Sequence, residues 1–163
     1  MRTARLAIRA VCELDRSRFL DLFTNPAFMV FSRSGALGTN AANLRFDRML
    51  ALSAEVPFCK QAIIEAATDV IIGYAGVDYF EYVGERRLEF GYRLVAESRG
   101  LGFATEAGLA ILALARETWH GQLFAFIDPD NQASRNVLNK LGFELVGPTS
   151  IQGLDVELYT LTI

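Results

Sequence analysis

The chain has 163 residues, 52% of them hydrophobic, and its 16 basic and 19 acidic residues give a net charge of −3. A chain of this length is most simply one domain, residues 1–163, that buries roughly 70% of the surface of its unfolded form. The acidic balance argues against a nucleic-acid surface, and no apolar run approaches the roughly 20 residues of a membrane span. The N-terminal segment alternates like a strand and lacks the features of a signal peptide. We therefore expect a soluble, cytoplasmic protein without nucleic-acid or membrane partners.

The first half of the sequence predicts one strand followed by two helices. "ARLAIRAV" alternates between polar and apolar residues, which is typical of a strand over residues 5–11. Asp15 is a candidate cap for a helix that ends near residue 24, before an Asn-Pro pair. The segment 32–42 is expected to be a loop, and Thr39 or Asn40 is a candidate cap for a second helix that ends near residue 54.

From residue 58 the hydrophobic period changes to that of strands. Three consecutive strands are expected over residues 58–66, 69–82 and 86–95, joined by the short turns of an antiparallel meander. The later elements are expected to be a helix over 101–119 that is apolar around most of its circumference, a strand over 122–128, a helix over 131–141 ended by Gly142, and strands over 143–147 and 154–163. This order predicts an α/β (α+β) fold in which helices pack on one curved, mixed sheet.

The cysteines and the histidine carry no chemical signature. Cys12 and Cys59 lie far apart and lack the spacing of metal ligands, so we expect reduced, packed thiols and no metal site. His120, the one histidine, follows a predicted helix end and is expected to match the helix dipole there.

The stretch "ESRGLGFATEA", residues 97–107, places two glycines, an arginine and a threonine where a strand meets a helix. The first turn of a helix has unpaired backbone N–H groups, for which an anion is a suitable ligand. One interpretation is a dinucleotide site, because "GLGFAT" resembles G-x-G-x-x-G and Asp128 ends the next strand. The antiparallel meander before the loop argues against it, because a dinucleotide fold has a parallel sheet there.

The other interpretation takes Arg99 to Ala104 as the motif R-x-x-G-x-A, and here the sequence resembles the GNAT superfamily of acyl-CoA-dependent N-acetyltransferases. Downstream, "DPDNQASRNVLNKLGFELVG" is similar to the second GNAT motif. The segments "LEFGYRL", "GFATEA" and "DPDNQASRNVLNKLGF" most resemble the RimJ/RimL subgroup, which acetylates the N-termini of ribosomal proteins. The resemblance spans the whole chain and is tightest over residues 88–147.

The resemblance implies a GNAT fold with about seven strands and four helices, in which the fourth and fifth strands splay around acetyl-CoA. Glycines at 100 and 102 leave room for a pyrophosphate beside the backbone, and the following helix adds its positive dipole end. Gly91 and the pair Val95-Ala96 are expected bulge positions in the fourth strand. The resemblance assigns acetyl-CoA to these residues: Tyr92, Arg93, Leu94, Val95, Arg99, Gly100, Leu101, Gly102, Phe103, Ala104, Thr105, Asn131, Ser134 and Lys140.

Glu89 is the candidate catalytic base. It lies ten residues before Arg99, at the acidic fourth-strand position that several family members use as a base. Counting by two places Glu89, Gly91 and Arg93 on one face of the strand, and the residues between them on the other. The alternative is a surface ion pair between Glu89 and Arg93.

Ser134 is the candidate proton donor to the departing thiolate. The family's common acid is a tyrosine seven residues after the motif asparagine Asn131, and here that position is Leu138. Members of the N-terminal-acetylating subgroup often have serine where this chain has Ser134. The alternative is that the Ser134 hydroxyl bonds to the backbone at the start of its helix.

These features predict an enzyme that transfers an acetyl group from acetyl-CoA to a primary amine. A protein α-amine of pKa about 8 costs only about 1.4 kcal/mol to deprotonate at pH 7, against about 4.6 kcal/mol for a lysine, so it needs less help from a base. We therefore expect a protein or peptide N-terminus as acceptor, with a small amine or a non-catalytic acyl-CoA module as alternatives. Acceptor contacts are expected from residues 26–54 and the last hairpin, and the apolar residues 28–31 leave both a monomer and a homodimer open.

Overall fold

A computed structural model describes residues 1–32, 34–151 and 153–163 of the chain. Arg33, in the predicted loop over residues 32–42, and Gln152, between the last two predicted strands, lie outside the described residues. None of the helices in the described ranges has the length and apolarity that a membrane span requires.

The elements follow the order that the sequence predicts, with ends that differ by a few residues. The helices and strands are β1 (Leu6–Arg9), α1 (Arg16–Thr24), α2 (Thr39–Ser53), β2 (Gln61–Glu65), β3 (Val70–Tyr82), β4 (Glu85–Leu94), α3 (Phe103–Thr118), β5 (Gln122–Ile127), α4 (Gln132–Leu141), β6 (Glu144–Ile151) and β7 (Leu154–Thr162). Single 3-10 turns, Glu13–Asp15 and Ala96–Ser98, precede α1 and follow β4. The largest difference is β6, which extends four residues beyond the expected end at residue 147.

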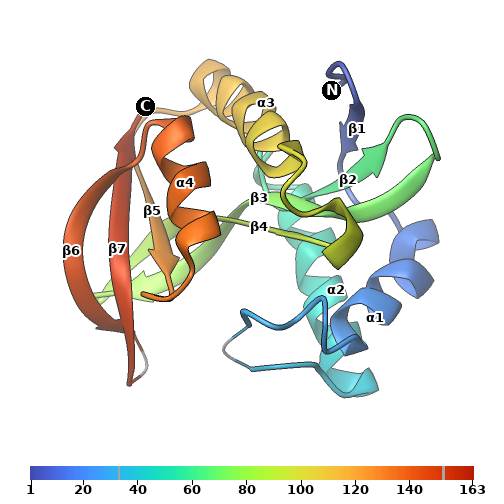
Figure 1. The fold of residues 1–163 in the computed structure, drawn as a ribbon, viewed down its shortest axis with the longest axis horizontal. Coiled ribbons are helices and arrows are strands. Elements are labelled where there is room, and N and C mark those ends of the chain that lie inside the picture. The colour runs from blue at the N-terminus through green and yellow to red at the C-terminus, as the bar shows by residue number, and fades with distance from the viewer. Residues whose placement is uncertain (33, 152) are drawn as a thin grey trace.

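The strands form one seven-stranded sheet in the order β1-β2-β3-β4-β5-β7-β6. All neighbouring pairs are antiparallel except β4 and β5, because the chain crosses over the sheet through α3 between these two strands. Figure 1 shows α3 and α4 on one side of the sheet and α1 and α2 on the other. The predicted mixed, mostly antiparallel fold is confirmed.

The register between β3 and β4 is continuous, which corrects one prediction. The hairpin closes through Val83 and Gly84, both at positive φ (51° and 75°), as a two-residue turn that suits the twist of its strands. Pairing then runs without a shift to Leu94, so the expected bulge at Gly91 is wrong. Register shifts occur instead in the β2–β3 and β6–β7 pairs.

Two predicted helix caps are also wrong. Asp15 occupies the N-cap position of α1, but its carboxylate accepts the Cys12 backbone N–H and pairs with Arg9 at 2.7 Å. The N-cap of α2 is Gly38, which has no side chain to donate or accept. Local capping propensity was outweighed at Asp15 by a nearby guanidinium, which forms a charge-assisted bond.

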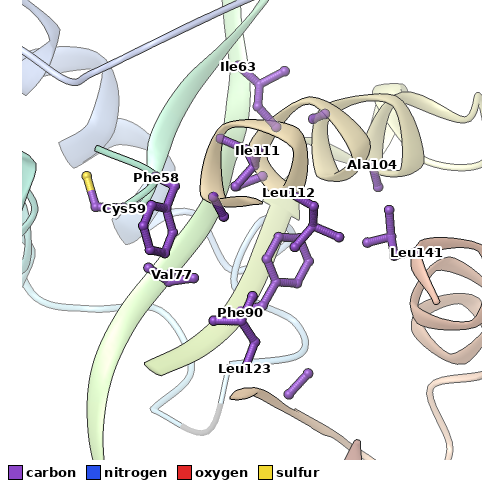
Figure 2. Close-up of a cluster of buried hydrophobic side chains, with 14 of the residues drawn as sticks. Phe58, Cys59, Ile63, Val77, Phe90, Ala104, Ile111, Leu112, Leu123 and Leu141 are labelled. Carbon is purple, nitrogen blue, oxygen red and sulfur yellow. The ribbon is translucent and has the colours of Figure 1, made fainter. Parts of the chain in front are cut away.

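The core consists of two clusters of apolar side chains on opposite faces of the sheet. The larger one lies between the sheet and the helices α3 and α4, and Figure 2 shows Ile111 and Leu112 of α3 packed against Phe90 and Leu123. The smaller one lies under α1 and α2 and contains the rings of residues 19, 23, 28, 46 and 74. Burial on both faces fixes the side-chain alternation of β3 and β4.

The two thiols are unpaired, as predicted, but only one of them is packed in the core. Cys59 is buried, and burial, followed by the negative charge of Asp78, raises the pKa of its thiol to about 11. Cys12 is exposed. Within the described residues, the His, Cys, Asp and Glu side chains form no group that could hold a metal ion.

Gly76 allows the segment before β2 to pass directly over β3. The Lys60 N–H donates to the Val77 carbonyl at 3.1 Å, and a Cβ added to Gly76 would lie 2.0 Å from the backbone oxygen of Cys59. The φ of Gly76, +139°, is also one that other residues rarely adopt. This close approach places Lys60 over the sheet.

We predict that Gly76→Ala lowers the free energy of unfolding by more than about 2 kcal/mol, because the new Cβ meets a backbone that cannot rotate away. Gly38→Ala is the matched control, since Gly38 has ordinary φ (−71°) and no atom within 4 Å of an added Cβ. Urea unfolding of both variants measures the difference. Equal stabilities would show that the segment before β2 moves freely and is not held against β3.

Candidate functional site

A cleft of about 940 Å³ opens where β4 and β5 separate. Its walls come from the second half of β4, the end of β5 and the first turns of α3 and α4. On the opposite side it is lined by residues 28, 30–32 and 34, by Arg45 of α2 and by the start of β7. The cleft therefore joins the two halves of the fold.

The separation of β4 and β5 is the origin of the cleft. Their parallel pairing is limited to two residue pairs, Leu88–Leu123 and Glu89–Phe124, although β4 continues to Leu94 and β5 to Ile127. Backbone N–H and C=O groups on this edge of β4 therefore face the cleft and not a neighbouring strand. Such groups suit an extended ligand with amide groups of its own.

The alternation of β4 divides its side chains between the two sides of the sheet, as counting by two predicts. Leu88 and Phe90 are buried under α3 and α4, with Tyr92 packed beside them. Glu89 and Arg93 lie on the other face, because their antiparallel partners Asp78 and Tyr74 share that face.

The glycine loop leads into α3 at the end of the cleft. Gly100 and Gly102 have φ of +75° and +84°, and α3 begins at Phe103. No atom lies within 4 Å of a Cβ added to Gly100, so this part of the loop is open. The unpaired N–H groups of the first turn of α3 and its positive dipole end favour an anion at this position.

Arg99 bonds to two backbone carbonyls in this structure. Its Nε donates to the Leu94 carbonyl at 3.0 Å, and its terminal nitrogen donates to the Ala27 carbonyl at 2.7 Å. These bonds connect the end of β4 to the chain that follows α1. The guanidinium charge remains beside the loop, where it contributes a positive potential.

At the start of α4, Asn131 caps the helix and Ser134 meets Tyr92. The Asn131 Oδ1 accepts the Ser134 backbone N–H at 3.0 Å and so caps α4. The Ser134 hydroxyl lies 3.1 Å from the hydroxyl of Tyr92, so the alternative of a bond to the backbone is not what the structure has. Burial raises the pKa of Tyr92 even though the bond to Ser134 acts to lower it, which keeps the phenol protonated.

Leu138 is 3% exposed and packs in the core between α3 and α4. Leu138 also lines the cleft, where it offers an apolar surface and no proton donor. Tyr92 provides a phenol on the same wall of the cleft, from β4 and not from α4. The sequence signal for it was the alternation of β4, which points residue 92 towards α4.

Glu89 lines the cleft, and no ion pair joins it to Arg93 within the described residues, so the expected alternative of a surface pair is wrong. Arg93 instead donates to the thioether sulfur of Met29 at 2.9 Å. Burial lowers the pKa of the Arg93 guanidinium, and the neighbouring charges of Arg45 and Arg99 lower it further.

Most of the predicted site residues come together in the cleft. Besides Glu89, those that line it are Tyr92, Arg93, Leu94, Arg99, Gly100, Gly102, Phe103, Ala104, Thr105, Asn131, Ser134 and Lys140. Two do not line it: Val95 packs against both core clusters, and the side chain of Leu101 is 55% exposed.

The sequence did not identify Arg45, Lys60 and Tyr74 as residues of the cleft. They lie on three elements that are distant in sequence, and no short motif joins them. Of the regions expected to contact the acceptor, Phe28, Phe31, Arg45 and the start of β7 line the cleft. Of the apolar patch at 28–31, however, Phe28 and Met29 are buried, and only the last two residues are exposed.

Residues 5–144 match the family model described as an acetyltransferase (GNAT) domain. This match covers more than half of the chain, and the chain belongs to the GNAT acetyltransferase family. The dinucleotide-binding alternative is therefore wrong, in keeping with a sheet whose one parallel pair in the described residues is β4–β5.

No curated protein matches the sequence, but solved structures match its fold. An acetyltransferase from Agrobacterium tumefaciens is 25% identical, with a TM-score of 0.81 over 99% of this chain and 92% of that one. A ribosomal-protein-S5-alanine acetyltransferase from Vibrio fischeri is 17% identical, with a TM-score of 0.79 over 99% and 95% of the two chains. A phosphinothricin acetyltransferase from Sinorhizobium meliloti, in complex with acetyl-CoA, is 18% identical, with a TM-score of 0.73 over 97% and 88%.

GNAT domains bind acetyl-CoA or coenzyme A and transfer the acetyl group to an amine. The cleft fits this co-substrate in two respects: an unpaired strand edge suits the amides of the pantetheine arm, and an open glycine loop at a helix start suits a pyrophosphate. The class of reaction follows from the family, whereas the acceptor does not.

Proposed function

We propose that this protein acetylates a protein or peptide α-amine, with acetyl-CoA held between β4, the glycine loop and α4. The observation that carries the proposal is the early end of β4–β5 pairing, since it opens a channel from the α3 N-terminus to Glu89 and Ser134. An α-amine suits this site because its pKa is low, so that a single carboxylate is sufficient to deprotonate it.

The coenzyme contacts that we propose follow the cleft from end to end. Tyr92 to Leu94 offer the backbone edge, and Gly100 to Thr105 hold the pyrophosphate with backbone N–H groups. Asn131 supports the ligand indirectly by fixing the first turn of α4. Acetyl-CoA, when bound, supplies the acetyl thioester.

We predict that Gly102→Val abolishes acetyl-CoA binding, because a branched side chain is strained at φ +84° and disturbs the loop beside the phosphates. Gly84→Val is the matched control, since Gly84 also has positive φ (+75°) but lies in the β3–β4 turn outside the cleft. Arg99→Ala should weaken binding by about 1.5–3 kcal/mol, the scale of a charged hydrogen bond. Calorimetry on folded variants measures both effects, and unchanged affinity in Gly102→Val and Arg99→Ala would remove the coenzyme assignment.

Glu89 is placed to act as the base. It lies on the same face of β4 as Gly91, and the cleft that it lines is bordered by residues 28 and 30–32, which follow α1. An amine can approach from solvent on this side. In the proposed step Glu89 takes a proton from the amine as nitrogen bonds to the acetyl carbon and the carbon–sulfur bond breaks. The resulting amide is neutral, so the proton must remain with Glu89 or pass to water.

We predict that Glu89→Gln lowers turnover by about a hundredfold and leaves acetyl-CoA affinity unchanged, because a base acts on the amine and not on the coenzyme. The remaining rate should rise with pH as the free amine loses its proton in solution. Glu81→Gln, an exposed change on β3, controls for loss of charge. If Glu89→Gln and the parent have the same turnover and pH–rate profile, Glu89 is not the base.

The hydroxyl pair of Tyr92 and Ser134 is the proposed donor to the departing sulfur. The two oxygens are 3.1 Å apart, so a proton given up by Ser134 can be replaced from the phenol. A thiol with a pKa near 8.5 has a thiolate that is a good leaving group. Protonating it at pH 7 is worth only about 2 kcal/mol, so a weak proton donor is sufficient. The pair takes the place of the tyrosine that the family commonly has at the position of Leu138.

We predict that Ser134→Ala slows single-turnover transfer about thirtyfold at saturating acetyl-CoA. Tyr92→Phe should slow it by a similar factor, and the double variant should be no slower than the worse single variant, because the two groups act as one donor. Tyr159→Phe, whose hydroxyl bonds to Glu157 outside the cleft, is the control. Additive losses would separate the two hydroxyls, and parent-like rates would leave solvent as the donor.

The acceptor assignment is tested by thiol release from acetyl-CoA over a panel of peptides, small amines and amino acids. Thiol release that is fastest with free peptide N-termini supports the proposal. The relatives bear names of both kinds, a ribosomal-protein acetyltransferase and a phosphinothricin acetyltransferase, so their names do not choose between acceptors. Absence of release with every amine would favour a non-catalytic acyl-CoA module.

A further inference from the structure

Three cationic side chains line the side of the cleft that lies across the sheet from α3 and α4. They are Arg45 of α2, Lys60 of the segment before β2 and Arg93 of β4, and we call them the cationic wall. All three are partly buried, and their charges act on the buried Tyr74, whose hydroxyl Arg45 contacts directly.

The two guanidinium groups of this wall lack a carboxylate partner. Arg45 donates to the Tyr74 hydroxyl at 3.0 Å and stacks over the ring of Phe23 at 4.9 Å. The bond from Arg93 goes to the sulfur of Met29, which is a weak acceptor. Neither arginine forms an ion pair with any residue in the described ranges.

Few carboxylates face the cationic wall, although Asp155, at the start of β7, also lines the cleft. Lys60 pairs with Asp78 at 3.5 Å, but Asp78 also pairs with Arg48 at 2.9 Å. Glu89 is the one carboxylate that acts on Tyr74, against three cations. Burial acts to raise the pKa of Tyr74, yet the charges of Arg45, Arg93 and Lys60 outweigh it, so the pKa is lowered and the local potential is positive.

Gly91 lies between Glu89 and Arg93 on one face of β4 and leaves open space there. Glu89, Gly91 and Arg93 share one face of β4, and the Cα atoms of Glu89 and Arg93, four residues apart on a strand, are about 13 Å from each other. A Cβ added to Gly91 would meet only the Cε of Lys60, at 3.9 Å. A small group can therefore lie on Gly91 with one end towards Glu89 and the other towards Arg93.

We propose that the acceptor carries a carboxylate close to its amine, and that Arg93, with Arg45, binds that carboxylate while the amine faces Glu89. This inference rests on the proposed acetyl transfer and narrows its acceptor to an amine with an adjacent acid. A planar guanidinium binds a carboxylate with two parallel hydrogen bonds, which also fixes the direction of the acceptor. Arg45 and Arg93 are partly buried and have no carboxylate partner in the described ranges, and a bound carboxylate would provide one.

The experiment compares pairs of acceptors that differ only in this charge. The probes are free L-amino acids and their carboxamides, and the peptide amides Asp-Ala-Ala and Asn-Ala-Ala, each assayed by thiol release with the parent, Arg93→Met and Arg93→Lys. Arg116→Met, which removes a charge from the exposed face of α3 outside the cleft, is the matched control. Melting temperatures identify any variant that does not fold, in which case Arg45→Met replaces Arg93→Met.

We expect the parent to prefer the acid of a pair over its amide by roughly ten- to a hundredfold in kcat/KM, the scale of a charged hydrogen bond. Arg93→Met should reduce this preference to near one, Arg93→Lys should restore part of it, and Arg116→Met should keep it; the ratio of acid to amide rates is the readout, so a change common to both acceptors does not affect it. A preference for free amino acids over their carboxamides indicates that the enzyme binds the main-chain carboxylate. A preference for the Asp peptide over the Asn peptide indicates that it binds the carboxylate of the first side chain.

Equal rates for acids and amides in the parent, or equal loss of both in Arg93→Met, would overturn the inference while leaving acetyl transfer intact. If no probe is acetylated, the proposed function fails, and calorimetric binding of the acids and amides to protein loaded with coenzyme A still tests the inference. Acids that bind more tightly than amides support it there, and equal binding refutes it.

Discussion

Parallel pairing between β4 and β5 ends after Glu89, and the rest of the site depends on that early separation. Neighbouring strands in a sheet are rotated against each other, so two strands that lose their hydrogen bonds diverge steadily along their length. The divergence places the start of α3 at one end of an open edge and the start of α4 beside its middle (Figure 1). The end of β4–β5 pairing thus opens a channel, and the start of α3 and the hydroxyl groups of Tyr92 and Ser134 lie along it.

The two core clusters pack helices against both faces of the sheet. Ile111, Leu112 and Leu141 pack α3 and α4 against one face, and the aromatic cluster under α1 and α2 covers the other. Leu138 contributes to this packing, which explains why α4 can lack the family's tyrosine: the position serves the core, and a phenol reaches Ser134 from β4 instead.

The cleft differs in charge from the molecule as a whole. The chain as a whole carries a net charge of −3, yet the cleft has the positive end of α3, Arg99 and the cationic wall. Both substrates of an acetyltransferase can be attracted by such a potential, the coenzyme through its phosphates and an acidic acceptor through its carboxylate. Glu89 lines this cleft together with Asp128 and Asp155.

The sequence by itself determined the order of the elements, the class of the sheet and most of the coenzyme channel, because these follow from local periodicity and from two contiguous motifs. It also determined the alternation along β4, since burial on one face dictates it. The caps of α1 and α2, the continuous β3–β4 register and the bonds of Arg99 did not follow from local propensity, because Asp15 bonds to Arg9 and Cys12, and Arg99 bonds to the carbonyls of Leu94 and the distant Ala27. Only the tertiary structure decided that Tyr92 meets Ser134 and that Arg45, Lys60 and Arg93 converge, because these contacts join α4, α2 and the segment before β2 across a sheet whose spacing no single segment encodes.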